Sequence, residues 1–206
     1  MKKIYVINGM AGSGKDTFVG YLSALVPTKH ISMVDCVKAI AKQIGWDGKK
    51  TEKDRKFLSD LKILIDNYND MNLNYVKDEI ESFLKDDSLT VLCIDMREAK
   101  DIHRLRQIYP LETILIYRKD VKNIKSNVAD AGVFNMDYDI TIDNSFSLDD
   151  LKTSVRLFVR NNLAANSSSP LDAMEASKKE VKKEAVQDKE AMMKEIWDLL
   201  GRLLNS

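Results

Sequence analysis

Short apolar segments alternate with segments of helical periodicity along residues 1–163. Five apolar runs predict strands, at Lys2–Asn8, His30–Val34, Leu89–Asp95, Glu112–Arg118 and Tyr138–Asp143. The first, third and fourth runs are apolar almost throughout, which is typical of strands covered on both faces of a parallel sheet. Helical patterns lie between them, at Lys15–Leu25, Asp35–Ile44, Thr51–Asn69, Leu73–Lys85 and Asp101–Tyr109. This alternation predicts βαβ units and a doubly wound α/β sheet.

The pattern changes after Leu163. Residues 164–171 are mostly small and polar, which is typical of a linker. In residues 172–206, apolar positions recur at spacings of three, four or seven, which predicts one long amphipathic helix. This helix could pack within the molecule or form a homo-oligomer, it could bind a partner, or it could be an appended segment. We therefore expect a domain at 1–163, a linker at 164–171 and a helix at 172–206.

The charge balance narrows the choice of partners. The 206 residues contain 32 Lys and Arg and 32 Asp and Glu, so the formal net charge is zero. A neutral chain argues against nucleic acid as a general partner, because nucleic-acid binding relies on excess positive charge. No apolar run has the roughly 18–20 residues that span a bilayer, and the polar face of the last helix lacks the cationic excess of membrane-surface helices. The sequence therefore predicts neither nucleic acid nor a membrane as a partner.

The N-terminus and the cysteines indicate a compartment. The chain begins with a strand-like run and shows no signal-peptide pattern. Its two cysteines, Cys36 and Cys93, lie in apolar stretches, as expected for free thiols in a reducing compartment. We therefore expect a cytoplasmic protein.

The most informative motif is the glycine-rich segment GMAGSGKDT at residues 9–17. It follows a predicted strand and opens a predicted helix, which is the context that a phosphate-binding loop requires. Glycines let backbone N–H groups approach phosphate oxygens, and the helix N-terminus favours an anion. We expect Lys15 to reach the β- and γ-phosphates of ATP. The expected nucleotide-binding residues are Gly9, Ala11, Gly12, Ser13, Gly14, Lys15, Asp16 and Thr17.

Two carboxylates are candidates for binding Mg²⁺. Asp16 stands where such loops usually carry a hydroxyl residue, and it could hold Mg²⁺ directly or through water, with the Thr17 hydroxyl nearby. Alternatively, Asp16 only stabilises the first helical turn through the helix dipole. Asp95 ends an apolar strand, as a Walker-B carboxylate does, although it could instead cap the following helix. The predicted metal ligands are thus Asp16, Thr17 and Asp95.

The loop resembles that of the P-loop nucleoside monophosphate kinases, and its GKDT form resembles the deoxynucleoside monophosphate kinase and phosphomevalonate kinase-like branch. Weaker matches follow in the same order, at residues 32–38, 52–58, 93–97, 137–144 and 148–151. The resemblance covers about residues 1–163. It implies a three-layer P-loop fold with a five-stranded, mostly parallel sheet, and ATP and Mg²⁺ as cofactors. It also implies a substrate-binding insert at about 45–87 and a short lid at about 119–136.

Phosphoryl transfer needs positive charge on the transferred group. Arginine suits this role because its forked donors match phosphate oxygens. The predicted catalytic residues are Lys15, Arg97 and Arg118. The predicted acceptor-binding residues are Asp35, Lys38, Arg55 and Arg97. Each of these could instead form a surface ion pair. The lid segment contains lysines but no arginine, which departs from the lids of the resembled kinases.

These observations predict an enzyme that transfers a phosphoryl group from ATP to a (deoxy)nucleoside monophosphate. Two alternatives stay open. One is a kinase for another small phosphate ester or alcohol. The other is a non-catalytic, nucleotide-responsive P-loop module that assembles through its C-terminal helix. His30 and His103 have no partner at metal-ligand spacing in the sequence, so we expect structural roles for both.

Overall fold

The computed structural model describes residues 2–49, 51–119, 133–134 and 136–163. The described part contains a parallel sheet in the order β2-β3-β1-β4-β5. Its strands are β1 (Lys3–Asn8), β2 (Thr28–Ser32), β3 (Val91–Asp95), β4 (Glu112–Tyr117) and β5 (Ile140–Asp143). The described helices are α1 (Lys15–Ser23), α2 (Asp35–Gln43), α3 (Glu52–Asn69), α4 (Met71–Lys85), α5 (Ala99–Arg106) and α7 (Leu148–Asn162). Most of the predicted lid, the linker at 164–171 and the helix at 172–206 lie outside the described residues.

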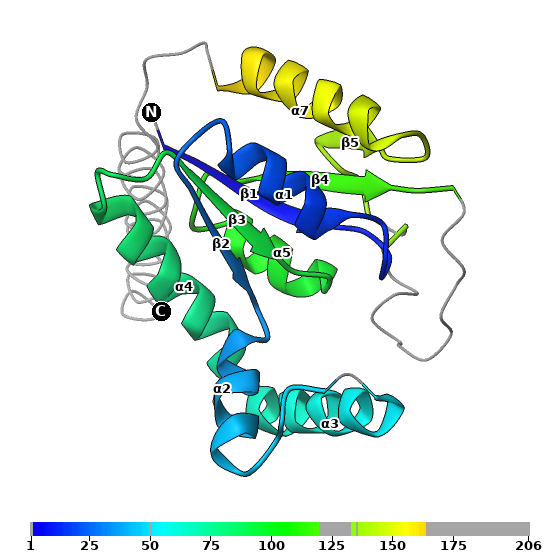
Figure 1. Cartoon of the computed structure of the whole chain (residues 1–206). Helices are drawn as coiled ribbons and strands as arrows, with labels where there is room; N and C mark the ends of the chain where they lie inside the picture. Colours follow the sequence, from blue (N-terminus) through cyan, green and yellow to red (C-terminus); the bar gives the residue numbers. More distant parts are fainter. Residues whose placement is uncertain (1, 50, 120–132, 135, 164–206) are drawn as a thin grey trace, which may run out of the picture.

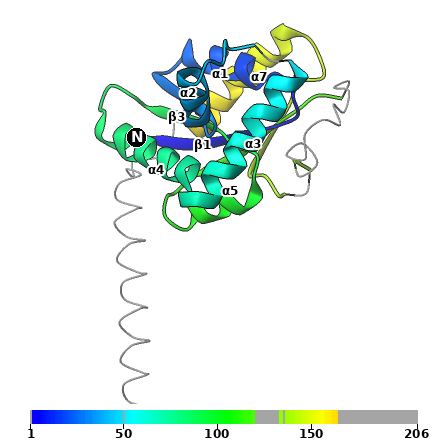
Figure 2. The same ribbon diagram turned by 90° about the horizontal axis from the view of Figure 1, so that it is seen from below.

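Helices cover both faces of the sheet, as Figure 2 shows. Successive residues of β1 point to opposite layers, so Ile4 belongs to the core under α4 and α5, and Tyr5 to the core under α1 and α7. In the second core the Phe158 ring packs edge-on against the rings of Tyr5, at 5.1 Å, and Phe18, at 5.6 Å. This double coverage explains why the central strands are apolar throughout. The predicted three-layer α/β fold is confirmed.

All described strands end at one edge of the sheet because they are parallel. The register pairs Asp95 at the end of β3 with Ile7 of β1 and with Ser32 of β2. The chain leaves β1 for α1 on one face and β3 for α5 on the other, so the connections diverge between these neighbouring strands (Figure 1). In open α/β sheets, ligands bind where such connections diverge. The carboxyl edge of β1 and β3 is therefore the place to search for a site.

The second strand lies two residues earlier than the sequence predicts. It covers Thr28–Ser32 instead of His30–Val34. The chain turns after Ser32 because α2 begins at Asp35, whose Oδ2 accepts a hydrogen bond of 2.7 Å from the Ser32 N–H. His30 consequently lies in the middle of β2, opposite Cys93. Among the described helices, none combines the length and apolar character needed to cross a bilayer.

Candidate active site

The loop between β1 and α1 depends on glycines at three positions. Gly9, Gly12 and Gly14 have φ angles of 147°, 82° and 99°, which side chains rarely tolerate. A Cβ on Gly9 would lie 2.5 Å from the carbonyl oxygen of Ile116 and 2.6 Å from Oγ of Ser13. The loop is thus folded tightly against the end of β4, in the form that brings backbone N–H groups together for a phosphate.

Lys15 lies folded over this loop. Its Nζ donates hydrogen bonds to the carbonyl oxygens of Gly9, at 2.9 Å, and Met10, at 3.1 Å. Gly14 is the N-cap of α1 and offers no side chain to the first N–H groups of the helix. These groups carry the partial positive charge of the helix N-terminus, so the helix and the Lys15 ammonium both favour an anion at this loop.

Asn144 braces the loop from the end of β5. Its side chain is 5% exposed, and its Nδ2 donates a 2.8 Å hydrogen bond to the carbonyl oxygen of Ser13. Its backbone N–H donates to the carbonyl oxygen of Tyr117 at 2.7 Å, which ties the turn to β4. A Cβ on Gly14 would lie 2.2 Å from Nδ2 of Asn144. The amide therefore fixes the loop where its last glycine opens α1.

Asp16, His30 and Asp95 come together beside the loop. One ligand atom from each lies within 4.8 Å of the others, and Nε2 of His30 is 3.3 Å from Oδ2 of Asp95. The hydrogen bond from His30 to Asp95 raises the pKa of the imidazole above its ordinary value, although partial burial opposes this. Within the described part of the chain, Oδ1 of Asp95 is buried and has no hydrogen-bond partner.

This cluster changes two expectations. Asp95 does not cap the helix after β3, because the N-cap of α5 is Glu98. The sequence neighbours of His30 suggest that it has no carboxylate partner. In the structure, Asp95 of β3 and Asp16 of α1 lie beside it. The oxygens of Asp16 and Asp95 are the hard donors that Mg²⁺ prefers, so the chain's residues fit this ion. Thr17 follows Asp16 in the first turn of α1 and is partly buried.

The two predicted catalytic arginines follow the strands that flank β1. Arg97 comes two residues after β3 and is partly buried, and its backbone N–H donates to Oε2 of Glu98 at 3.3 Å. Arg118 directly follows β4 and is exposed. Because β1 lies between β3 and β4, the topology places these residues on either side of the strand that leads into the phosphate loop.

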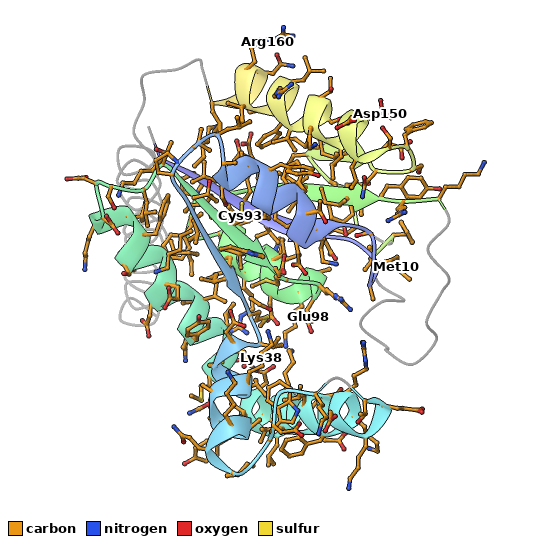
Figure 3. The ribbon with its side chains drawn as sticks, viewed as in Figure 1. Met10, Lys38, Cys93, Glu98, Asp150 and Arg160 are labelled. Carbon is orange, nitrogen blue, oxygen red and sulfur yellow. The ribbon has the colours of Figure 1, made fainter. Side chains whose placement is uncertain are left out.

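Apart from Arg97, the predicted acceptor-binding residues lie on α2 and α3, which extend beyond the carboxyl edge of the sheet (Figure 1). Asp35 and Lys38 form an ion pair of 2.8 Å in the first turns of α2. Arg55 is exposed near the start of α3. In Figure 3, Lys38 and Glu98 lie at the same end of the sheet as Met10 of the phosphate loop. These positions are compatible with an acceptor between the loop and α3.

Polar contacts anchor α3. The helix begins with a capping box between Thr51 and Asp54, and none of its residues is buried. Lys62 links the helix to the sheet, because its Nζ lies 3.0 Å from Oδ2 of Asp66 and 3.1 Å from Oε1 of Glu98, which follows β3. Burial alone would lower the pKa of Lys62, but Glu98 and Asp66 raise it above its ordinary value. The Lys62 ammonium thus holds α3 to the edge of the sheet.

A series of side-chain hydrogen bonds leads from Asp66, a partner of Lys62, into the core. The Asp66 carboxylate accepts a hydrogen bond from the Asn72 amide, which is fully buried. Oδ1 of Asn72 in turn accepts from Sγ of Cys36 at 2.9 Å. This series links α3, α4 and α2. Because buried polar groups are costly when unpaired, it fixes how the three helices meet.

Replacing Lys62 with methionine should release α3. We expect Lys62→Met to lower the free energy of unfolding by about 1–2 kcal/mol, because Asp66 and Glu98 lose a partner that is only 17% exposed. Amide hydrogen exchange in α3 should also accelerate. Lys56→Met is the matched control on the same helix, since Lys56 is 77% exposed in its pair with Asp60. Equal effects of both substitutions on exchange would contradict the anchoring role.

The chain was compared with protein-family models, with curated proteins and with solved structures. No family model and no curated protein matches it. Thymidylate kinase from Candida albicans aligns at 15% identity and a TM-score of 0.48, over 81% of this chain and 96% of that one. Shikimate kinase from Aquifex aeolicus aligns at 14% identity and a TM-score of 0.47, over 78% of this chain and 98% of that one. APS kinase from Mycobacterium tuberculosis aligns at 12% identity and a TM-score of 0.42, also over 78% of this chain and 98% of that one.

The strand order, the phosphate loop and the flanking layers of this chain confirm the predicted P-loop fold. The resemblance of the loop motif to that of the nucleoside monophosphate kinases, and the branch within them, stay a prediction from the sequence.

Proposed function

We propose that the protein is an ATP-dependent kinase that transfers a phosphoryl group to a (deoxy)nucleoside monophosphate. One observation carries the proposal. A glycine loop with Lys15 at its helix N-terminus lies beside the carboxylates of Asp16 and Asp95 at one edge of the sheet. An anion site next to a hard-oxygen cation site is the arrangement that a metal–nucleotide complex requires.

On the donor side, the loop amides and Lys15 would hold the phosphates. Lys15 would exchange the carbonyl oxygens of Gly9 and Met10 for phosphate oxygens, which are stronger acceptors because they are charged. Asp16 and Asp95, with the Thr17 hydroxyl, would hold Mg²⁺. The ion would supply positive charge to the phosphate oxygens.

Exposed aromatic side chains at the same edge support a nucleotide as the donor. Tyr117, at the end of β4, is 37% exposed, and its ring packs edge-on against that of Phe134 at 6.4 Å. Phe146 is 71% exposed two residues after Asn144, whose backbone is bonded to Tyr117. Exposed rings beside a phosphate loop provide surfaces on which a base can stack. We propose that the donor base binds here.

On the acceptor side, Arg97 and Arg118 would neutralise charge on the transferred group and on the acceptor phosphate. Both residues follow strands that flank β1, where an acceptor facing the loop would meet them. Arg55, Asp35 and Lys38 would bind the acceptor from α2 and α3. The Asp35–Lys38 ion pair presents one acceptor group and one donor group together, which suits a polar substrate.

The test is ADP release from Mg-ATP with a panel of ribo- and deoxynucleoside monophosphates. We expect one or a few members to stimulate ADP release at least tenfold over the rate without acceptor. Shikimate, a sugar phosphate and phosphomevalonate belong in the same panel, because a kinase for another phosphate ester or alcohol is the main alternative.

The outcomes separate the hypotheses. Stimulation by a non-nucleotide alone would overturn the substrate class and retain the kinase. A panel without any stimulation, in a protein that binds ATP, would favour a nucleotide-responsive module. Loss of the stimulation in Arg97→Ala, with ATP affinity unchanged, would support Arg97 on the acceptor side.

A further inference from the structure

His30 lies within the cation site of a fold that is expected to use Mg²⁺. Its Nε2 is 3.3 Å from Oδ2 of Asp95, and the Asp16 carboxylate completes the group within 4.8 Å. Magnesium selects oxygen ligands and keeps much of its water shell, so an imidazole adds little to a Mg²⁺ site. Imidazole is instead a favourable ligand for divalent transition metals. The imidazole of His30 therefore shifts the preference of the site from Mg²⁺ toward divalent transition metals.

The geometry requires small movements to enclose an ion. Nitrogen and oxygen ligands lie about 2.0–2.2 Å from such ions, which places ligand atoms around one ion roughly 3–3.5 Å apart. The three ligand atoms here are already within 4.8 Å, and Asp16 is exposed on the first turn of α1. The side chains of His30 and Asp95 are 31% and 21% exposed, so an ion from solvent can reach both.

The electrostatic surroundings also favour a cation. Asp16 and Asp95 contribute two carboxylates, and the charge of Asp35 acts on His30 from the start of α2. One oxygen of Asp95, Oδ1, is buried and lacks a hydrogen-bond partner among the described residues. An unpaired carboxylate oxygen is costly, and a nearby cation offsets that cost.

We propose that Asp16, His30 and Asp95 bind a divalent transition metal ion, such as Co²⁺, Mn²⁺ or Zn²⁺, in the absence of nucleotide. The affinity follows the general preference of nitrogen and oxygen sites, so Co²⁺ and Zn²⁺ bind more tightly than Mg²⁺. His30 is a ligand in this site. It does more than orient the Asp95 carboxylate by a hydrogen bond.

Co²⁺ is the probe, because its visible absorption reports its ligands. The full chain is titrated with Co²⁺ without nucleotide. We expect an absorption band that saturates at one equivalent, and a Co²⁺ affinity that falls at least tenfold in His30→Gln. The chain has only two histidines, so His103→Gln is the matched control and should change the affinity less than twofold. Lys15→Ala removes a positive charge from the adjacent loop and should not weaken Co²⁺ binding, so failure of the nucleotide site and failure of the metal site are distinguished.

Several results would overturn the proposal. These are the absence of a saturable band, equal affinities in the two histidine variants, or an intense near-ultraviolet thiolate band that assigns the ion to Cys36 or Cys93. A second measurement covers poor folding of His30→Gln. In the unsubstituted protein, substoichiometric Mn²⁺ should broaden the imidazole ¹⁵N resonances of His30 and leave those of His103 sharp. Broadening of both histidines alike, or of neither, would contradict the site.

Discussion

Replacing Lys15 with alanine should lower the rate of phosphoryl transfer by about 10²–10³-fold, because a fixed positive group facing the developing charge contributes several kcal/mol to catalysis. The fold should persist. Lys15 is only partly buried, and its bonds to the carbonyl oxygens of Gly9 and Met10 contribute on the order of 1 kcal/mol. Initial rates with Mg-ATP and the best acceptor of the panel provide the measurement, together with thermal unfolding.

The matched control is Lys42→Ala, which removes an exposed lysine from the last turn of α2. This variant should retain the wild-type rate. If Lys15→Ala keeps more than about a tenth of the wild-type rate while its fold is intact, the ammonium does not stabilise the transferred group as proposed and the site assignment is wrong.

Gly14→Ala should disrupt both the loop and the stability of the domain. The new Cβ would lie 2.2 Å from Nδ2 of Asn144, in a backbone with φ at 99°. We expect the free energy of unfolding to fall by about 2–4 kcal/mol, because left-handed strain costs roughly 1–2 kcal/mol and the amide of Asn144 must also leave Ser13. ATP affinity should fall at least tenfold, as the N–H groups at the start of α1 move. Urea unfolding and equilibrium ATP binding measure the two effects.

Gly12→Ala separates strain from collision. Gly12 has φ at 82°, but a Cβ there would meet nothing within 4 Å, so only the strain of roughly 1–2 kcal/mol is expected. The double variant that combines Gly14→Ala with Asn144→Ala tests the collision between the new Cβ and the Asn144 amide. Gly14→Ala should cost at least about 1 kcal/mol less when Asn144 is alanine, because neighbouring substitutions then couple. Additive effects would show that the amide of Asn144 does not hold the loop.

The sequence was sufficient to predict the features that depend on local pattern. Near-continuous apolar runs identify buried parallel strands, and β1, β3 and β4 lie where those runs predict them. The loop at residues 9–17 is recognisable because glycines, lysine, strand and helix are adjacent in the chain. Asp95 was also predictable as a site residue, since it ends a central strand at the edge where ligands bind.

Contacts between distant segments escaped prediction. His30 is separated by many residues from Asp16 and Asp95, and only the pairing of β2 with β3 brings it to them. The position of β2 was predicted two residues too late, because a short apolar run does not define where a strand begins and ends. Asn144 meets Ser13 across 131 residues. No spacing within the sequence encodes such a contact, which depends on β5 joining the sheet beside β4.

The polar contacts that anchor α3 could not be predicted from the sequence either. Of the apolar residues at helical spacing in α3, Phe57, Leu61 and Ile65 are partly buried and Leu64 is exposed, so the pattern identified the helix but not its polar anchor. Lys62, which reads in the sequence as one more surface charge, is the residue that ties the helix to Glu98. Burial of a charged side chain depends on its tertiary partners, so the helical pattern gave no sign of it.

We propose that residues at the carboxyl edge of the sheet transfer a phosphoryl group from ATP to a small acceptor. The most direct measurement follows the label of [γ-³²P]ATP in the presence of Mg²⁺ and a nucleoside monophosphate from the panel. We expect the label to appear on the acceptor, as a nucleoside diphosphate, and Lys15→Ala to form this product about 10²–10³-fold more slowly. Label recovered only as ATP and inorganic phosphate with every acceptor, in a protein that binds ATP, would contradict the proposal.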